Sequence, residues 1–448
     1  MSKPLSRRKI LADTVAAAGV FSAGTFGASV FGISVFGTSA FGTSAFAAPA
    51  GRDSAGDPAA QWWGWRGPNA NNHAGEGNTI PDDKLQTRIA WSIDIPGRGH
   101  SSPIVVGDAL YMATAVKETG TQAILKISQT GKAVWAVPVH QGGLPSKNHP
   151  KNTEASSTLA FDGEGLLASF YNNDAIRMTR LTLDGKIVWQ KEIGRYQPKQ
   201  YKYGYAASPL IYGDSVIVVG DYDGPGFLAS LNSRTGEENW KIKRPGKLSF
   251  SSPIVANIGG RDQLLLSGNE MVAAYDPATG RVLWKTDNAT TMATCGTMVW
   301  DDSRVFASGG YPKAGTVAIA ADGSGRVLWS NPTKCYEQSM LIHGGNLFAV
   351  SDSGVAYCWD AEDGTERWKK RLGGNYSSSP ILVGDVIHVF NENGEGFAFT
   401  ASAKGFEARG RSKVGDETFA SPVVVDSTMY LRVAKTDRSR QESLLAIL

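Results

Sequence analysis

The chain has 448 residues, of which 42% are hydrophobic and 10% aromatic, and its net charge is +3. Residues 1–47 hold four basic residues and one acidic residue, so the remaining chain has equal numbers of basic and acidic residues. This balance gives no reason to expect nucleic acid or an anionic membrane as partner, and three cysteines are too few for a disulfide scaffold.

Residues 1–47 have the features of a twin-arginine-type signal peptide. Arg7 and Arg8 lie in a Ser-Arg-Arg-Lys-Ile-Leu motif that resembles the twin-arginine export signal, with Ile10 where Phe is usual. A weakly hydrophobic stretch rich in Gly and Ser follows, and Ala45–Ala47 offers a small-x-small cleavage site. We expect an exported protein, periplasmic or secreted, with no membrane span after cleavage. An uncleaved anchor is the alternative.

Residues 48–84 are expected to form a linker with a Trp-rich segment. They are rich in Gly, Asn and Ala and contain Trp62, Trp63 and Trp65. These indoles either pack over the side of the following domain, which is the more common outcome, or contact a partner.

From residue 85 onward, a unit of four short strands repeats along the chain. A turn glycine followed four residues later by Trp recurs, as in Gly280 and Trp284. An opening segment of the Ser-Ser-Pro-Ile type recurs at residues 101–104, 207–210, 251–254, 378–381 and 420–423, with degenerate versions near Ser156, Gly296 and Gln338. A repeat of roughly 40–50 residues with four strands is typical of a β-propeller blade.

The opening segments predict eight blades, with seven as the alternative count. The last unit stops at Leu448 before a fourth strand, and an unpaired strand around Trp91 precedes the first unit. We therefore expect an all-β, eight-bladed β-propeller over residues 85–448. Its N-terminal strand would complete the last blade, because an open ring exposes two sheet edges.

Ala274, Asp276, Gly280 and Trp284 have a spacing that resembles the docking motif of the pyrroloquinoline-quinone (PQQ)-like β-propeller family of exported bacterial proteins. The resemblance implies that the motif tryptophan packs between adjacent blades and is structural. The tryptophans at this position are Trp91, Trp135, Trp189, Trp240, Trp284, Trp329 and Trp368.

No catalytic pattern is recognisable. The six histidines have no metal-type spacing, and the chain has no Gly-x-Ser-x-Gly elbow, phosphate loop or Cys-x-x-Cys. The resemblance implies that the family's quinoprotein dehydrogenases carry adjacent cysteines and a calcium site. This chain has no Cys-Cys pair. We expect no catalytic residue, metal or cofactor. PQQ with calcium is expected only if the protein is such a dehydrogenase.

Candidate binding residues stand just before each opening segment, where a ring brings equivalent positions together around a central funnel. They are Arg98, His100, Glu154, Tyr203, Tyr205, Phe250, Cys295, Tyr336, Glu337, Asn375, Tyr376, Glu417 and Phe419. The two longest inter-blade connections, residues 138–154 and 194–206, are expected on the same face, and the second interleaves tyrosines with basic residues. Tyrosine offers stacking area and a hydroxyl at low entropic cost.

We predict ligand contacts at Arg98, His100, Tyr201, Tyr203, Tyr205, Tyr336, Glu337 and Tyr376. The alternative is a solvated loop whose tyrosines lie on the blade edge. Cys295 and Cys335 fall at near-equivalent positions in adjacent units, so a disulfide and two free thiols both remain open.

Three functions remain open. The favoured one is an exported, non-enzymatic propeller that binds a protein or glycan partner. The second is a PQQ-dependent quinoprotein dehydrogenase, which rests on repeat similarity alone. The third is a scaffold of the outer-membrane barrel-assembly type, whose propeller has similar repeats. That scaffold is a lipoprotein and needs a Cys directly after its signal peptide, whereas the first Cys here is Cys295.

Overall fold

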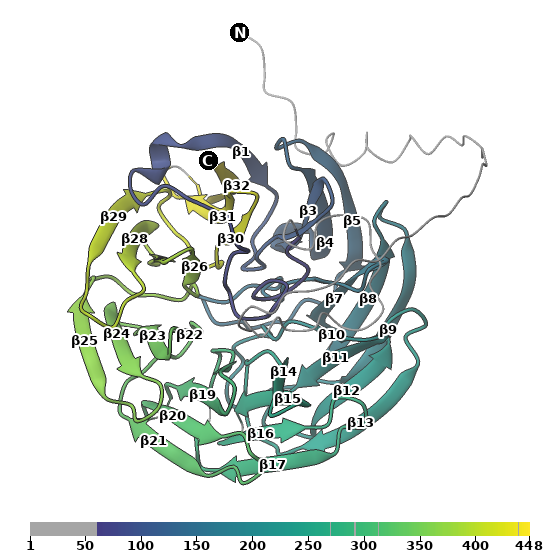
Figure 1. Ribbon diagram of the computed structural model, residues 1–448. Helices are drawn as coiled ribbons and strands as arrows, with labels where there is room; N and C mark the ends of the chain where they lie inside the picture. The colour runs from purple at the N-terminus through teal and green to yellow at the C-terminus, as the bar shows by residue number, and fades with distance from the viewer. Residues whose placement is uncertain (1–60, 269, 291–292, 312, 438) are drawn as a thin grey trace, which may run out of the picture. The chain divides into compact units, whose positions relative to one another are not determined.

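Short strands separated by glycine turns form antiparallel sheets arranged in a ring (Figure 1). The computed structural model describes residues 61–448 except residues 269, 291, 292, 312 and 438, so the predicted signal peptide lies outside the described residues. The described residues contain 32 strands in eight four-stranded sheets. The all-β, eight-bladed prediction is therefore confirmed, and the alternative count of seven is wrong.

The blades are numbered in chain order. Blade 1 consists of β2 (Ile104–Val106), β3 (Ala109–Val116), β4 (Thr121–Ser128) and β5 (Ala133–Gln141), and blade 2 of β6 (Ala160–Phe161), β7 (Gly165–Asn172), β8 (Ala175–Thr182) and β9 (Ile187–Arg195). Blade 3 consists of β10 (Leu210–Tyr212), β11 (Ser215–Gly220), β12 (Gly226–Asn232) and β13 (Glu238–Arg244), and blade 4 of β14 (Ile254–Ile258), β15 (Arg261–Gly268), β16 (Met271–Tyr275) and β17 (Val282–Asp287).

Blade 5 consists of β18 (Val299–Trp300), β19 (Arg304–Gly309), β20 (Gly315–Ala320) and β21 (Val327–Asn331), and blade 6 of β22 (Leu341–His343), β23 (Asn346–Val350), β24 (Val355–Asp360) and β25 (Glu366–Arg371). Blade 7 consists of β26 (Ile381–Val383), β27 (Val386–Phe390), β28 (Glu395–Thr400) and β29 (Ala408–Lys413). Blade 8 consists of β30 (Val423–Val425), β31 (Thr428–Lys435), β32 (Gln441–Ile447) and β1 (Ile89–Ile95).

The ring closes through the N-terminal strand. In blade 8 the strand order is β1-β32-β31-β30, and β1 pairs antiparallel with β32, with Ile93 opposite Leu444. The first strand of each blade lies near the axis, and the fourth lies at the exposed rim (Figure 1). The predicted closure is confirmed. The described helices, η2 (Leu85–Thr87) and η3 (Lys117–Thr119), are far too short to cross a membrane.

The rim tryptophans stack on the turn glycine of the next blade. A Cβ added to Gly280, whose φ is +72°, would stand 2.6 Å from the indole of Trp240 in the preceding blade. Only glycine fits such a turn, because it tolerates positive φ and leaves room for the ring. The same contact joins Trp91 to Gly131, Trp135 to Gly185, Trp189 to Gly236, Trp284 to Gly325 and Trp329 to Gly364.

The indole N–H groups form hydrogen bonds across the same junctions. Trp91 Nε1–H donates to the backbone oxygen of Gln129 at 2.9 Å. Trp284, which is 5% exposed, donates instead to Gln263 Oε1 at 2.7 Å. The Nε2–H of Gln263 then donates to the oxygen of Ala321 in blade 5 at 3.0 Å. Each junction therefore combines apolar stacking with a satisfied indole N–H group.

Residues 61–84, predicted as part of a linker, pack against the ring. Trp62 is 2% exposed and pairs through its backbone with Val105 on β2. The carbonyl of Trp63 accepts a hydrogen bond from Phe161 on β6, at 2.8 Å.

The same segment continues across the ring to the far blades. Asn72 accepts a hydrogen bond from the N–H of Leu382 on β26, at 3.0 Å. Thr79 N–H donates to Ser427 Oγ in blade 8, also at 3.0 Å. Blades 1, 2, 7 and 8 therefore all contact one N-terminal segment, which crosses the middle of the ring in Figure 1.

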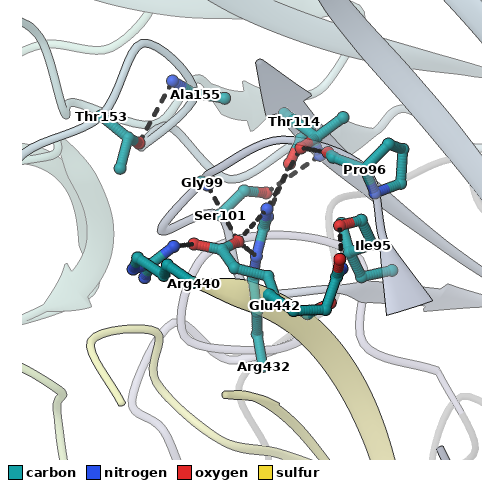
Figure 2. A network of polar contacts seen from close by, with 12 residues as sticks. Ile95, Pro96, Gly99, Ser101, Thr114, Thr153, Ala155, Arg432, Arg440 and Glu442 are labelled. Carbon is teal, nitrogen blue, oxygen red and sulfur yellow. Dashed lines mark hydrogen bonds and ion pairs between the residues drawn. The ribbon is translucent and has the colours of Figure 1, made fainter. Parts of the chain in front are cut away.

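A buried ion pair lies at the seam where blade 8 meets blade 1 (Figure 2). The side chains of Arg432 and Glu442 are each 2% exposed, and their charged groups are 2.5 Å apart. Arg432 also donates to the backbone oxygen of Ala113 on β3 at 2.8 Å, and Gly99 N–H donates to Glu442 Oε2 at 3.1 Å. Arg440 completes the network by pairing with the other carboxylate oxygen of Glu442 (Figure 2). The seam is thus held by charge-assisted hydrogen bonds as well as by β1.

Candidate functional site

A ring of hydroxyl groups surrounds the propeller axis, one from the second position of each opening segment. Its members are Ser102, Thr158, Ser208, Ser252, Thr297, Ser339, Ser379 and Ser421. The backbone N–H of one member donates to the hydroxyl of the next blade's member, as from Ser208 to Ser252 and from Ser379 to Ser421, both at 2.9 Å. These bonds explain why the repeat requires Ser or Thr there, since a buried backbone N–H needs a partner.

A cavity of about 280 Å³ opens at this ring. At its base lie ring serines and Trp65, whose indole N–H donates to Thr297 Oγ1 at 2.8 Å. Trp65 belongs to the N-terminal segment that crosses the ring, so this segment supplies the floor of the cavity. The walls come from His100, Phe250, Cys295, Tyr311, Lys334, Tyr336, Glu337, Ser377 and Phe419, together with His149, Lys151, Asn152 and Tyr203 from the inter-blade loops.

Two loops extend over the cavity, residues 142–156 between blades 1 and 2 and residues 196–207 between blades 2 and 3; we call them the lid loops. Lys151 of the first forms a 2.7 Å salt bridge with Glu392 of blade 7. Tyr201 of the second packs edge-on against Tyr311 of blade 5, with ring centroids 5.8 Å apart. Each loop therefore contacts a blade that is not adjacent to either of the blades that it joins.

The lid loops also contact each other. The rings of His149 and Tyr203 meet edge-on with centroids 4.9 Å apart, and Asn152 Nδ2–H donates to the backbone oxygen of Tyr203. Arg98, in the connection between blades 8 and 1, donates to the backbone oxygen of Pro150 at 2.9 Å and so supports the first loop. The lid is a connected structure, not two independent loops.

The cavity is electrostatically mixed. Lys151 and Lys334 are paired with Glu392 and Asp352, at 2.7 and 3.0 Å. Burial raises the pKa of the Glu337 carboxyl, although the nearby Ser377 hydroxyl and the charge of Lys151 oppose this shift. Burial also lowers the pKa of His100 and of His149, so both imidazoles are mainly neutral at pH 7.

The predicted contact residues occupy different positions relative to the cavity. His100, Tyr203, Tyr336 and Glu337 line it. Tyr201 and Arg98 stand beside it, where they support the lid loops.

Tyr205 and Tyr376 do not line the cavity. Tyr205 is 7% exposed, and its hydroxyl donates to the backbone oxygen of Val219 at 3.1 Å. Tyr376 is 1% exposed and packs in the blade 6–7 core. Both side chains were expected at the funnel because of their sequence position, but they turn into the adjacent blade interiors.

The structure has no bond between Cys295 and Cys335. Both are free thiols, and so is Cys358. Cys335 is fully buried in the core beside Phe306, whereas Cys295 faces the cavity. The two sulfur atoms therefore occupy separate environments, and the structure has the free-thiol alternative.

Several cavity residues carried no sequence signal. Lys151 and Glu392 are 241 residues apart and meet only in the fold. Tyr311 follows β19 and lies away from the opening segments, and Lys334 lies after β21, just upstream of the candidates Tyr336 and Glu337. The serines of the ring were visible only as a repeat marker. Among the described residues, no group of three His, Cys, Asp or Glu side chains is placed to hold a metal ion.

Eight four-stranded blades, inter-blade tryptophans and a lidded axial cavity define a PQQ-like repeat propeller. A family model described as "Outer membrane protein assembly factor BamB" matches residues 182–351 and 313–408, together about half of the chain. The chain belongs to this family of PQQ-like repeat propellers.

Named relatives and solved structures are similar over most of the chain. The outer membrane protein assembly factor BamB of Burkholderia pseudomallei is 23% identical over 354 residues, which cover 70% of this chain and 88% of the relative. The crystal structure of BamB from Moraxella catarrhalis has a TM-score of 0.58 at 15% identity, covering 80% of this chain and 97% of that one. A europium-containing methanol dehydrogenase has a TM-score of 0.64 at 12% identity, covering 88% and 98%. These structural similarities concern the fold.

Proposed function

We propose that this protein is an exported, non-enzymatic binding scaffold that holds a partner protein at its lidded face. The observation that carries the proposal is the lid itself. Two long loops contact each other through His149 and Tyr203, and they contact blades 7 and 5 through Lys151 and Tyr201. They present aromatic and basic side chains around one cavity. Loops on a rigid ring of blades are a common place for binding residues.

The identity of the partner is proposed from the relatives. Those that match the chain are named outer membrane protein assembly factors. We propose a protein of outer membrane assembly as the partner, and therefore a periplasmic location that follows export by the predicted signal peptide. A glycan is the alternative occupant of the same face.

Photo-crosslinking tests this proposal. A photoreactive amino acid replaces Tyr201 at the lid in one variant and Thr279 on the opposite face in a second, both in the native host. We expect a protein adduct from position 201 and none from position 279, with its identity read by mass spectrometry. An adduct confined to position 279 would contradict the proposed face. A glycan adduct at position 201 would contradict the proposed protein partner.

A PQQ-dependent dehydrogenase is the second candidate, because the methanol dehydrogenase shares the fold. The cavity residues do not fit the quinone well. PQQ carries three carboxylates, whereas Lys151 and Lys334 are already paired with acidic residues and Glu337 adds a further carboxyl group. We propose that no quinone is used. Protein incubated with PQQ and calcium should show no quinone absorbance after gel filtration; retained quinone with dye-linked alcohol oxidation would favour the dehydrogenase.

A further inference from the structure

We propose that the axial cavity binds an organic cation, an ammonium or guanidinium group, between its aromatic side chains and the carboxylate of Glu337. This inference deepens the proposed function and rests on it where the cation is a lysine or arginine side chain of the partner protein. A free quaternary ammonium compound is a second source of the same chemistry.

The distribution of charge in the cavity favours a cation. Lys151 and Lys334 are neutralised by Glu392 and Asp352. Among the described residues, no Lys, Arg or His lies within salt-bridge distance of Glu337, which lines the cavity. The charges that act on Glu337 are those of Lys151, Glu392 and Asp352. Two lysines, Lys151 and Lys334, face three carboxylates, so the cluster keeps one net negative charge when all five groups are ionised. A carboxylate in a poorly solvated site is stabilised by a cationic partner.

The aromatic lining favours the same class of ligand. Six Trp, Tyr and Phe side chains line the cavity: Trp65, Tyr203, Phe250, Tyr311, Tyr336 and Phe419. The electron-rich faces of aromatic rings attract ammonium and guanidinium groups, most strongly when the cation is desolvated. Lys334 already uses this contact, since its Nζ lies 5.3 Å from the centroid of the Tyr336 ring. Aromatic rings around one carboxylate form a recognised type of receptor for organic cations.

The volume limits the size of the occupant. A cavity of about 280 Å³ holds a side chain or a small head group, but not a folded segment of a partner. The lid loops would remain outside to contact the rest of a partner. A cation bound beside Glu337 would also stabilise the ionised carboxylate, so its binding would release a proton at a pH near the raised pKa of this group.

Isothermal titration calorimetry of the purified protein tests the inference with choline and with N-acetylarginine amide as probes. Dimethylbutanol, the uncharged isostere of choline, is the ligand control. We expect at least one cationic probe to bind, with affinity about ten-fold or more above that of dimethylbutanol. The affinity should fall about ten-fold or more in Glu337→Gln and as the solution is acidified. Glu362→Gln, an exposed change on a distant turn, should leave binding unchanged.

The inference would be overturned if Glu337→Gln bound the cations as tightly as the unchanged protein, or if dimethylbutanol bound as tightly as choline. It would also be overturned if neither cation bound. Thermal denaturation of Glu337→Gln establishes that the variant is folded. The crosslink from position 201 tests the proposed function separately from the cation site. If the protein forms the adduct but binds neither probe, the scaffold function is supported and the cation site is rejected. Choline binding without any adduct supports a free ammonium ligand and overturns the protein partner. Loss of the adduct in Glu337→Gln assigns the cation to the partner.

Discussion

Lys151 and Glu392 form a salt bridge of 2.7 Å between a lid loop and blade 7 of the propeller. The lysine side chain is 42% exposed, so the pair is worth at most about 1 kcal/mol. Its importance is positional, because it fixes the loop over the cavity without a large contribution to global stability.

Lys151→Met should therefore loosen the lid selectively. We expect hydrogen exchange within residues 142–156 to accelerate about 1.5- to 5-fold, with little change in thermal stability. Lys147→Met, on the same loop and exposed, is the control and should not alter exchange. Unchanged exchange in the Lys151 variant would show that the salt bridge does not hold the lid.

Trp284→Ala should destabilise the junction between blades 4 and 5. The substitution removes a side chain that is 5% exposed and leaves Gln263 without its indole donor. We expect a loss of about 3–5 kcal/mol in the free energy of unfolding, measured by denaturant titration. Val282→Ala, at a side chain that is 49% exposed, should change it by no more than about 0.5 kcal/mol. Equal effects would contradict the packing role.

Glu442→Gln should weaken the seam between blades 8 and 1, because it leaves the buried guanidinium of Arg432 without its anion. The expected cost is about 3–5 kcal/mol in the free energy of unfolding. Glu192→Gln is the matched control, since Glu192 pairs with Arg177 at 2.9 Å but is 49% exposed; its cost should stay below about 1 kcal/mol. A stable Glu442→Gln protein would mean that β1 alone closes the ring.

His388→Phe should reduce the acid sensitivity of the protein. Burial lowers the pKa of His388 from 6.5 to about 4 in the folded state, so the unfolded chain binds a proton first as the pH falls. Folding stability is therefore lost between pH 6.5 and about 4, by up to about 3 kcal/mol for this residue. The phenylalanine variant should lose correspondingly less stability over this range. Identical pH profiles for both proteins would contradict the buried neutral imidazole.

The fold was predictable because its determinants are local and repeated. Turn glycines such as Gly280 and tryptophans such as Trp240 recur at fixed spacing, and the strand around Trp91 had no other partner. The direction in which a side chain near the funnel points is not determined by the local sequence. Tyr203 lines the cavity, whereas Tyr205, two residues later, is buried against Tyr196 of the same loop.

The floor and the lid depend on contacts between distant segments. Trp65 reaches Thr297 across 232 residues, and no repeat or motif connects the two positions. The Lys151–Glu392 contact is of the same kind. Long-range pairs of this type depend on loop conformations that the surrounding blades select, so sequence periodicity does not reveal them.

The central claim is that a partner binds at the lidded face, and hydrogen exchange of the protein with and without its crosslink-identified partner tests it most directly. We predict protection of residues 142–156 and 196–207, with the turns at Gly236 and Gly280 unchanged. Protection confined to those turns, with both lid loops exchanging as in the free protein, would contradict the account.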